Sequence, residues 1–281
     1  MSEKFLKVYE LSLKEAFLKS LPPQHGAWSV LISGWAIGTF TFGNPDYKIL
    51  LLFITMISGF CLRYSVTSAI KNWKTRLEFP DKYEFIIMFF YGSLTLAGFS
   101  ILVFFHHLYY LFLFGIFVLI LAAITMKLEL DSKHLTVVGE LVGMISLSTV
   151  IPVASYVAAE HLNHETGVIW ILSLYLFAGS VFHVRYMVRK NKFHSSPIVQ
   201  RLMAGKSSII FHFLGFIVFL SAAICHIISP LNILPVSIVF FRAIWMILKK
   251  WEKPLPVRRL GFVELFITSL FSIMVITVNR S

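Results

Sequence analysis

Residues 108–127 read LYYLFLFGIFVLILAAITMK, and the terminal Lys127 is the only charged residue in the run. A helix needs about 20 apolar residues to cross a hydrocarbon core about 30 Å thick. This run therefore predicts a membrane-spanning helix, and similar runs occur on both sides of it. The chain as a whole predicts nine spans: 26–43, 47–66, 84–105, 108–127, 135–158, 167–189, 207–228, 231–249 and 261–279.

The composition agrees with a multi-pass membrane protein. Hydrophobic residues make up 57% of the 281 positions and charged residues only 14%, whereas a soluble domain carries about 25% charged residues. The net charge of +11 would suggest nucleic acid as a partner of a soluble protein. In a membrane protein the same surplus belongs to the cytoplasmic loops. We therefore expect membrane lipids as partners and no nucleic acid.

Lysine and arginine are distributed on one side of the predicted membrane. All but three of the 25 such residues lie in residues 1–24, in alternate connections between the spans, or at the span ends beside them. The exceptions are Lys48, Arg242 and Arg280. Because basic residues are enriched on the cytoplasmic side, the pattern predicts an all-α polytopic fold with an inner N-terminus and an outer C-terminus.

Residues 1–24 precede the first apolar run and form a charged leader. Glu3, Lys7, Glu10 and Lys14 recur at helical spacing, which fits an amphipathic helix lying on the membrane surface. A polar extension without this role is the alternative. The predicted organisation is an interfacial leader over residues 1–24 and one nine-helix transmembrane domain over residues 25–281.

Two similar stretches carry an arginine at an expected inner helix end. Residues 58–66 read SGFCLRYSV and residues 180–188 read SVFHVRYMV. Arg63 and Arg185 thereby fall at the inner ends of the second and sixth predicted spans, both of which run inward. The similarity of the two stretches agrees with the equivalent positions of their spans in the predicted topology, which favours an internal repeat.

A second pair of positions is separated by the same number of residues as Arg63 and Arg185. Gly139 and Gly261 lie at the inner starts of the fifth and ninth predicted spans, and Glu140 and Glu264 follow them closely. A carboxylate inside a span is a functional hypothesis by default. The alternative is simple stabilisation of negative charge by the positive end of each helix dipole.

These residues define a predicted anion site. Arginine can hold phosphate or carboxylate through paired hydrogen bonds without a metal, and we expect Glu140 or Glu264 to form an ion pair with Arg63 or Arg185. His25, just before the first span, could contact a ligand or act as an acid or base. Contact with anionic lipid headgroups is the alternative role of the basic residues. Secondary candidates at the same side are Asn72, Arg76, His183 and Arg189.

The expected outer side carries histidines instead. Residues 160–165 read EHLNHE, and histidines three apart beside carboxylates could bind zinc or copper. A solvated polar loop is the favoured interpretation of so short a pattern. We therefore predict no metal site.

The stretch PPQHGAW at residues 22–28 resembles the opening signature of the YwiC-like family of bacterial membrane proteins, and residues 182–185 with Arg189 and residues 260–264 resemble further family segments. The resemblance spans most of the chain. It implies a multi-pass protein of the bacterial inner membrane and does not imply a particular activity.

In architecture the predicted protein is also similar to UbiA-type prenyltransferases. Those proteins have nine helices, an inner N-terminus, and aspartate-rich motifs that hold a prenyl diphosphate through magnesium. The matching segments here, residues 63–73 and 185–191, contain no aspartate. Because magnesium prefers carboxylate and phosphate oxygens, the resemblance concerns the fold and leaves an isoprenoid ligand as a possibility.

Together these features predict an anionic lipid headgroup or small anion bound in a cytosol-facing basic cavity without magnesium. Whether the ligand is bound, transformed or moved is left open, and no cofactor or catalytic residue is predicted. A UbiA-like enzyme with an altered site is one alternative, and an anion or metabolite transporter is another.

Overall fold

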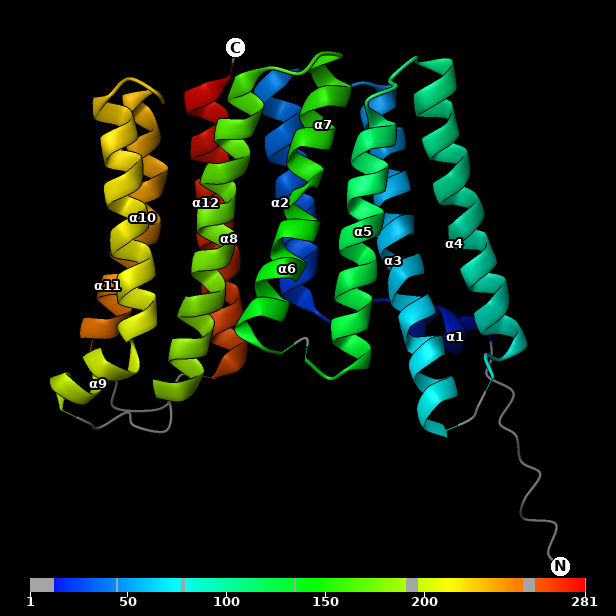
Figure 1. Ribbon diagram of the computed structural model, residues 1–281, viewed down its shortest axis with the longest axis horizontal. Coiled ribbons are helices and arrows are strands. Elements are labelled where there is room, and N and C mark those ends of the chain that lie inside the picture. The colour runs from blue at the N-terminus through cyan, green and yellow to red at the C-terminus, as the bar shows by residue number, and fades with distance from the viewer. Residues whose placement is uncertain are drawn as a thin grey trace, which may run out of the picture. The chain divides into compact units, whose positions relative to one another are not determined.

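The fold is all-helical throughout the part of the chain that the computed structural model describes. Eight of its helices are long and apolar enough to cross a membrane. This confirms the prediction of an all-α polytopic membrane protein (Figure 1). The described residues are 13–43, 45–76, 79–133, 135–190, 197–249 and 256–280.

The first predicted span corresponds to α2 (His25–Phe42), which is not among these eight. Its 18 residues include several Gly, Ser and Thr, which lower its mean hydropathy. The count of nine spans and the orientation stay predictions. The second span was predicted too short, because α3 (Tyr47–Arg76) continues well past residue 66 and places Asn72 on the helix.

The fifth predicted span consists of two helices, α6 (Val137–Ser148) and α7 (Val150–Ala159). The Thr136 side chain caps α6 by accepting a hydrogen bond from the Gly139 backbone N–H at 3.1 Å, which fixes Glu140 in the first turn. Pro152 lies in the first turn of α7, where its missing N–H costs nothing. The proline thus favours a new helix start here.

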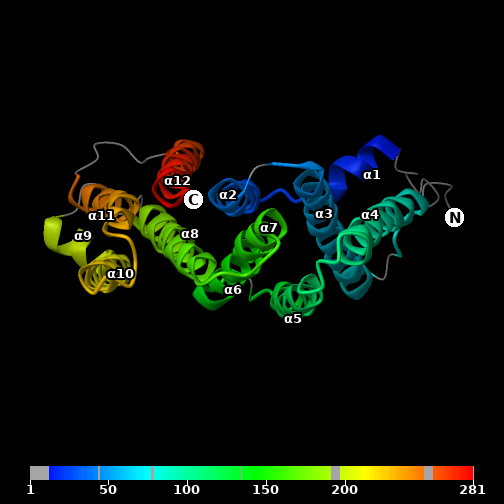
Figure 2. The same ribbon diagram turned by 90° about the horizontal axis from the view of Figure 1, so that it is seen from above.

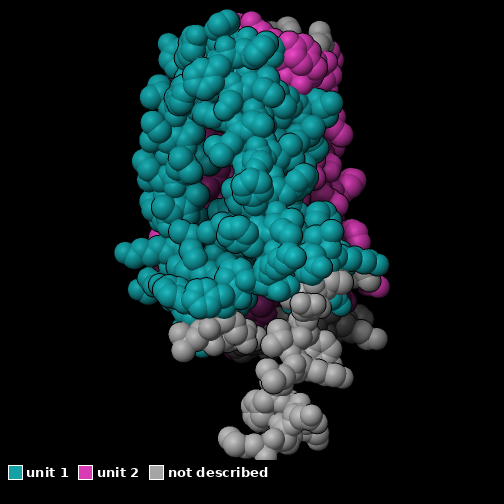
Figure 3. Space-filling model, turned by 90° about the vertical axis from the view of Figure 1, so that its right-hand side faces the viewer, with its two compact units in different colours: residues 1–24, 50–133 teal, residues 25–49, 134–281 magenta. Residues whose placement is uncertain are grey.

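The chain divides into two compact units, coloured separately in Figure 3. Unit 1 comprises residues 1–24 and 50–133, and unit 2 comprises residues 25–49 and 134–281. The elements of unit 1 are α1 (Leu13–Ser20), α3 from Leu50 onward, α4 (Lys82–Ser100), the π-helical segment η2 (Ile101–Phe105) and α5 (Leu111–Leu130).

Short polar contacts connect the helices of unit 1. The Thr95 hydroxyl of α4 donates to the Ser58 hydroxyl of α3 at 3.0 Å. The hydroxyls of Ser20 in α1 and Tyr91 in α4 lie 3.2 Å apart. Part of the predicted leader, Leu13–Ser20, is helical. The charged residues Glu3, Lys7 and Glu10 lie outside the described residues. Its position on the membrane surface stays a prediction.

Unit 2 contains the close approach of α2 to α7 (Figures 1 and 2). A Cβ atom on Gly38 would lie only 2.4 Å from the Ile151 carbonyl oxygen and 2.9 Å from the Ala154 Cβ. Small residues allow such contact between helices in membranes. The other elements of unit 2 are α8 (His164–Lys190), α9 (Ile198–Ala204), α10 (Lys206–Ile224), the 3-10 helix η3 (Pro230–Asn232), α11 (Ile233–Leu248) and α12 (Val257–Asn279).

Aromatic rings fill the contacts of α8 and α11 with α10. Phe182 of α8 stacks on Phe211 of α10 with ring centroids 4.7 Å apart. Phe216 of α10 stacks on Phe240 of α11 at 4.5 Å. Stacked rings add specific geometry to the burial of apolar area. This packing holds α8 and α11 at fixed rotations, which determines where their charged residues point.

Candidate functional site

An ion pair is buried between α11 and α12 in unit 2. The Arg242 Nη1 atom lies 2.6 Å from the Glu264 carboxylate, and the side chains are only 4% and 13% exposed. The same nitrogen donates to the Ser180 hydroxyl of α8 at 3.4 Å. Because an unpaired charge in this position would be costly, each residue is needed to neutralise the other.

His183 joins this pair from α8. Its side chain is fully buried, and the Nε2 atom lies 3.7 Å from the Glu264 carboxylate. Ser180 and His183 are three residues apart, so they share one side of the helix. The structure thus gathers Arg242, Glu264, His183 and Ser180 into one cluster, which we call the buried polar cluster.

The buried polar cluster lies inside the apolar part of the helices. Arg242 precedes the end of α11 at Leu248 by nearly two turns, which is roughly 9 Å at 1.5 Å per residue. Glu264 is at a comparable distance from Arg259, where the corresponding apolar span begins. Ionisable groups at such depth usually mark a functional position in membrane proteins.

A second ion pair connects α8 to the start of α6. The Arg185 Nε atom lies 2.5 Å from the Glu140 carboxylate, and both side chains are about a quarter exposed, at 24% and 29%. Arg185 also donates to the Leu135 carbonyl oxygen. The predicted pairing of one glutamate with one arginine is therefore confirmed. Arg185 and His183 point to different sides of α8 because they are two residues apart.

The remaining two residues of the predicted set have other partners. Glu264 pairs with Arg242 rather than with Arg63 or Arg185. In unit 1, the Arg63 Nη1 atom lies 3.7 Å from the Glu129 carboxylate and 3.3 Å from the Thr125 hydroxyl of α5. The physical reason is the direction of each side chain around its own helix, which sequence spacing between distant helices does not specify.

A pocket shared by Arg63 and Arg185 stays a prediction, because the two residues belong to different units and each is described within its own. His25 begins α2 and Arg76 ends α3, but their side chains lie outside the described part. Arg189 is exposed near the end of α8, and Asn72 of α3 lines a pocket in unit 1.

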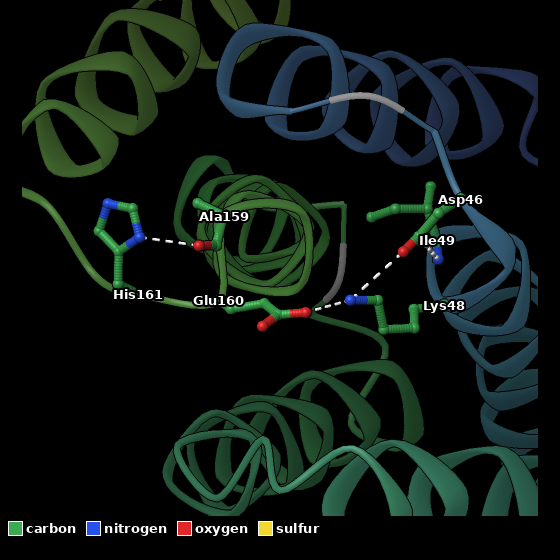
Figure 4. A network of polar contacts seen from close by, with 6 residues as sticks. All are labelled: Asp46, Lys48, Ile49, Ala159, Glu160 and His161. Atoms are coloured by element: carbon green, nitrogen blue, oxygen red, sulfur yellow. Dashed lines mark hydrogen bonds and ion pairs between the residues drawn. The ribbon is translucent and has the colours of Figure 1, made fainter.

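The opposite end of unit 2 carries a smaller exposed network (Figure 4). Lys48 forms ion pairs with Asp46 and with Glu160, which follows the last turn of α7. Among the described residues, no three His, Cys, Asp or Glu side chains come together in a way that could hold a metal ion. His161 of the stretch 160–165 contacts the Ala159 carbonyl oxygen at 2.7 Å.

Sequence reasoning missed Arg242 as the partner of Glu264. The available signal was its position as the one arginine within the interior of an apolar run, since such a residue needs a counter-charge. Glu129 was missed for a different reason. It lies at the end of α5, where a carboxylate looks like an ordinary solvated helix terminus.

The apolar helices and their internal ion pairs define a multi-pass integral membrane protein in contact with membrane lipids. Residues 21–155, just under half of the chain, match the family described as YwiC-like protein. No curated protein and no solved structure matches the chain. The resemblance to UbiA-type architecture therefore stays a prediction.

Proposed function

We propose that the protein binds an anionic lipid headgroup or small anion, without magnesium, at the lysine- and arginine-rich end of its helices. The observation that carries this proposal is uncompensated positive charge in unit 2. Glu140 and Glu264 are already engaged by arginines. Within the described ranges, four further cations at this end have no ion pair with a carboxylate: Arg189, Arg201, Lys206 and Arg259.

The donor set also favours an anion over a metal-bridged ligand. A guanidinium can hold phosphate oxygens directly, whereas magnesium needs carboxylates that are free to coordinate it. Arg185 is the proposed primary contact, because Glu140 and the Leu135 carbonyl fix its orientation while a quarter of the side chain stays exposed.

The proposed site extends to the other predicted residues. His25, Arg63, Glu140 and Glu264 complete the proposed binding set, with Glu140 and Glu264 orienting arginines rather than touching the ligand. Secondary contributors are Asn72, Arg76, His183 and Arg189. The charge distribution supports a cytoplasmic location for this end in a bacterial inner membrane, and an isoprenoid phosphate is one acidic lipid that such a site could take.

Native mass spectrometry of the purified protein tests this proposal. The probe is phosphatidylglycerol, titrated with and without a magnesium chelator. We expect replacement of Arg185 and Arg189 by glutamine to weaken binding by at least about a hundredfold, because it removes two charge-assisted hydrogen bonds of roughly 1.5–3 kcal/mol each. Lys48→Gln is the matched control at the opposite end. Equal affinities for all variants, or binding abolished by the chelator, would contradict the proposal.

Transport of an anion is the second candidate, because the buried polar cluster places charge about two turns inside the helices. A transporter needs polar groups along a path through the membrane. Uptake of a radiolabelled anion such as phosphate into proteoliposomes distinguishes the two functions. Uptake that Glu264→Gln abolishes supports transport, whereas binding without uptake supports a headgroup site.

A further inference from the structure

A pocket of about 210 Å³ lies in unit 1 among α1, α3 and α4. These three helices are adjacent in both ribbon views (Figures 1 and 2). The polar side chains that line it include Lys19, Tyr64, Ser65, Ser68, Asn72 and Glu84. This pocket does not contain Arg63, and of the residues proposed above it contains only Asn72.

The spacing along α3 explains why these polar groups meet. Ser65, Ser68 and Asn72 are three and four residues apart, so they form one stripe on the helix. Arg63 lies on another side of α3 and contacts α5 through Thr125. The stripe faces α1 and α4, which contribute Lys19 and Glu84 to the same pocket.

Three of the lining groups have hydrogen-bonding capacity that the protein does not use. Within the described part of the chain, the side chains of Lys19, Asn72 and Glu84 make no recorded hydrogen bond or ion pair. By contrast, the Ser65 hydroxyl is already engaged, donating to the Cys61 carbonyl at 2.9 Å. The pocket therefore offers one cation, one anion and one amide.

We propose that this pocket binds a phospholipid headgroup that carries both a phosphate and a primary ammonium, as in phosphatidylethanolamine. Lys19 would contact the phosphate, and Glu84 would accept hydrogen bonds from the ammonium. Asn72 and Ser68 would complete the contacts to the phosphate ester oxygens. A purely anionic headgroup fits less well, because it would leave Glu84 facing negative charge.

The surroundings of the pocket favour a lipid over a soluble zwitterion. Leu13, Phe17 and Leu18 of α1 are each about half exposed, which is typical of a helix whose apolar side enters the membrane interface. On α4, Phe85 and Phe89 are 65% and 70% exposed beside Glu84. Acyl chains could therefore run along α4 while the headgroup occupies the pocket.

Competition in native mass spectrometry tests this site with the full chain. The probes are phosphatidylethanolamine, phosphatidylglycerol and free phosphoethanolamine. We expect the ethanolamine lipid to bind about tenfold more tightly to this site than the glycerol lipid, and the free headgroup to bind far more weakly than the lipid. Glu84→Gln should remove the preference for ethanolamine, and Lys19→Gln should weaken both lipids.

Matched controls in the same unit are Asp131→Asn and Lys71→Gln, which change equal charges outside the pocket. Both should retain the wild-type preference. Equal affinity for the two lipids in a protein carrying Arg185→Gln and Arg189→Gln overturns the proposal even if Glu84→Gln or Lys19→Gln fails to fold. A preference that survives Glu84→Gln also overturns it, and tight binding of free phosphoethanolamine replaces the lipid with a soluble ligand. Phosphatidylglycerol is also the probe for the site at Arg185, so the lipids are compared in the Arg185→Gln, Arg189→Gln background, in which the two proposals fail separately.

Discussion

Replacing Glu264 by glutamine removes the only carboxylate recorded beside the Arg242 guanidinium in the described structure. The arginine side chain is 4% exposed, so water cannot replace the lost counter-charge. The fully buried His183 would lose the same partner. The substitution keeps the size of the side chain and therefore changes charge rather than packing.

The expected cost follows from this burial. Breaking one side of a buried ion pair typically destabilises a protein by about 3–5 kcal/mol, whereas replacing both partners by apolar residues of similar volume is often nearly neutral. We therefore expect Glu264→Gln to cost about 3–5 kcal/mol. The double variant Arg242→Met with Glu264→Leu should recover most of that loss.

Equilibrium unfolding in mixed micelles, followed by circular dichroism, measures these free energies. The control is Lys48→Gln, because its partner Glu160 is 58% exposed and exposed pairs contribute only about 0–1 kcal/mol. The reasoning is refuted if Glu264→Gln costs no more than this control. It is also refuted if the double variant is as unstable as the single one, since that outcome would assign the effect to packing.

Three further substitutions can be compared in the same unfolding assay. Gly38→Leu should destabilise the protein by at least about 1–3 kcal/mol, because its Cβ would clash with the Ile151 carbonyl at 2.4 Å; a stability unchanged within error would contradict the close approach of α2 and α7. Arg185→Lys should cost about 1 kcal/mol, since a single ammonium cannot keep both contacts of the guanidinium; full stability would mean that one contact suffices. Thr136→Ala should cost about 1 kcal/mol through the lost cap, and Thr136→Ser, which retains the hydroxyl, should cost clearly less.

Much of the fold could be predicted because a run of apolar residues in the local sequence is enough to indicate a membrane-spanning helix. The hydrophobic thickness of the bilayer sets a minimum length for each apolar run, so runs such as residues 108–127 identify their own helices. The errors occurred where local rules compete. α3 continues to Arg76 because polar residues after the apolar run still favour a helix.

The candidate site was predicted in part. One glutamate was expected to pair with one arginine at the same end of the helices, and Glu140 with Arg185 confirms this. Glu264 pairs with Arg242, which was not among the expected partners. The polar pocket beside α1 was not predicted as a pocket, because its lining residues are ordinary serines, lysine and glutamate in separate segments.

The sequence by itself determined the class of the protein, the approximate spans and the end at which positive charge collects, because hydrophobic length and charge counts add along the chain. Only the tertiary structure decided which acid meets which base. A side chain's direction depends on how its helix is rotated, and that rotation is set by contacts such as Gly38 on Ile151 and Phe182 on Phe211. Those contacts join residues far apart in sequence, so no local pattern contains them.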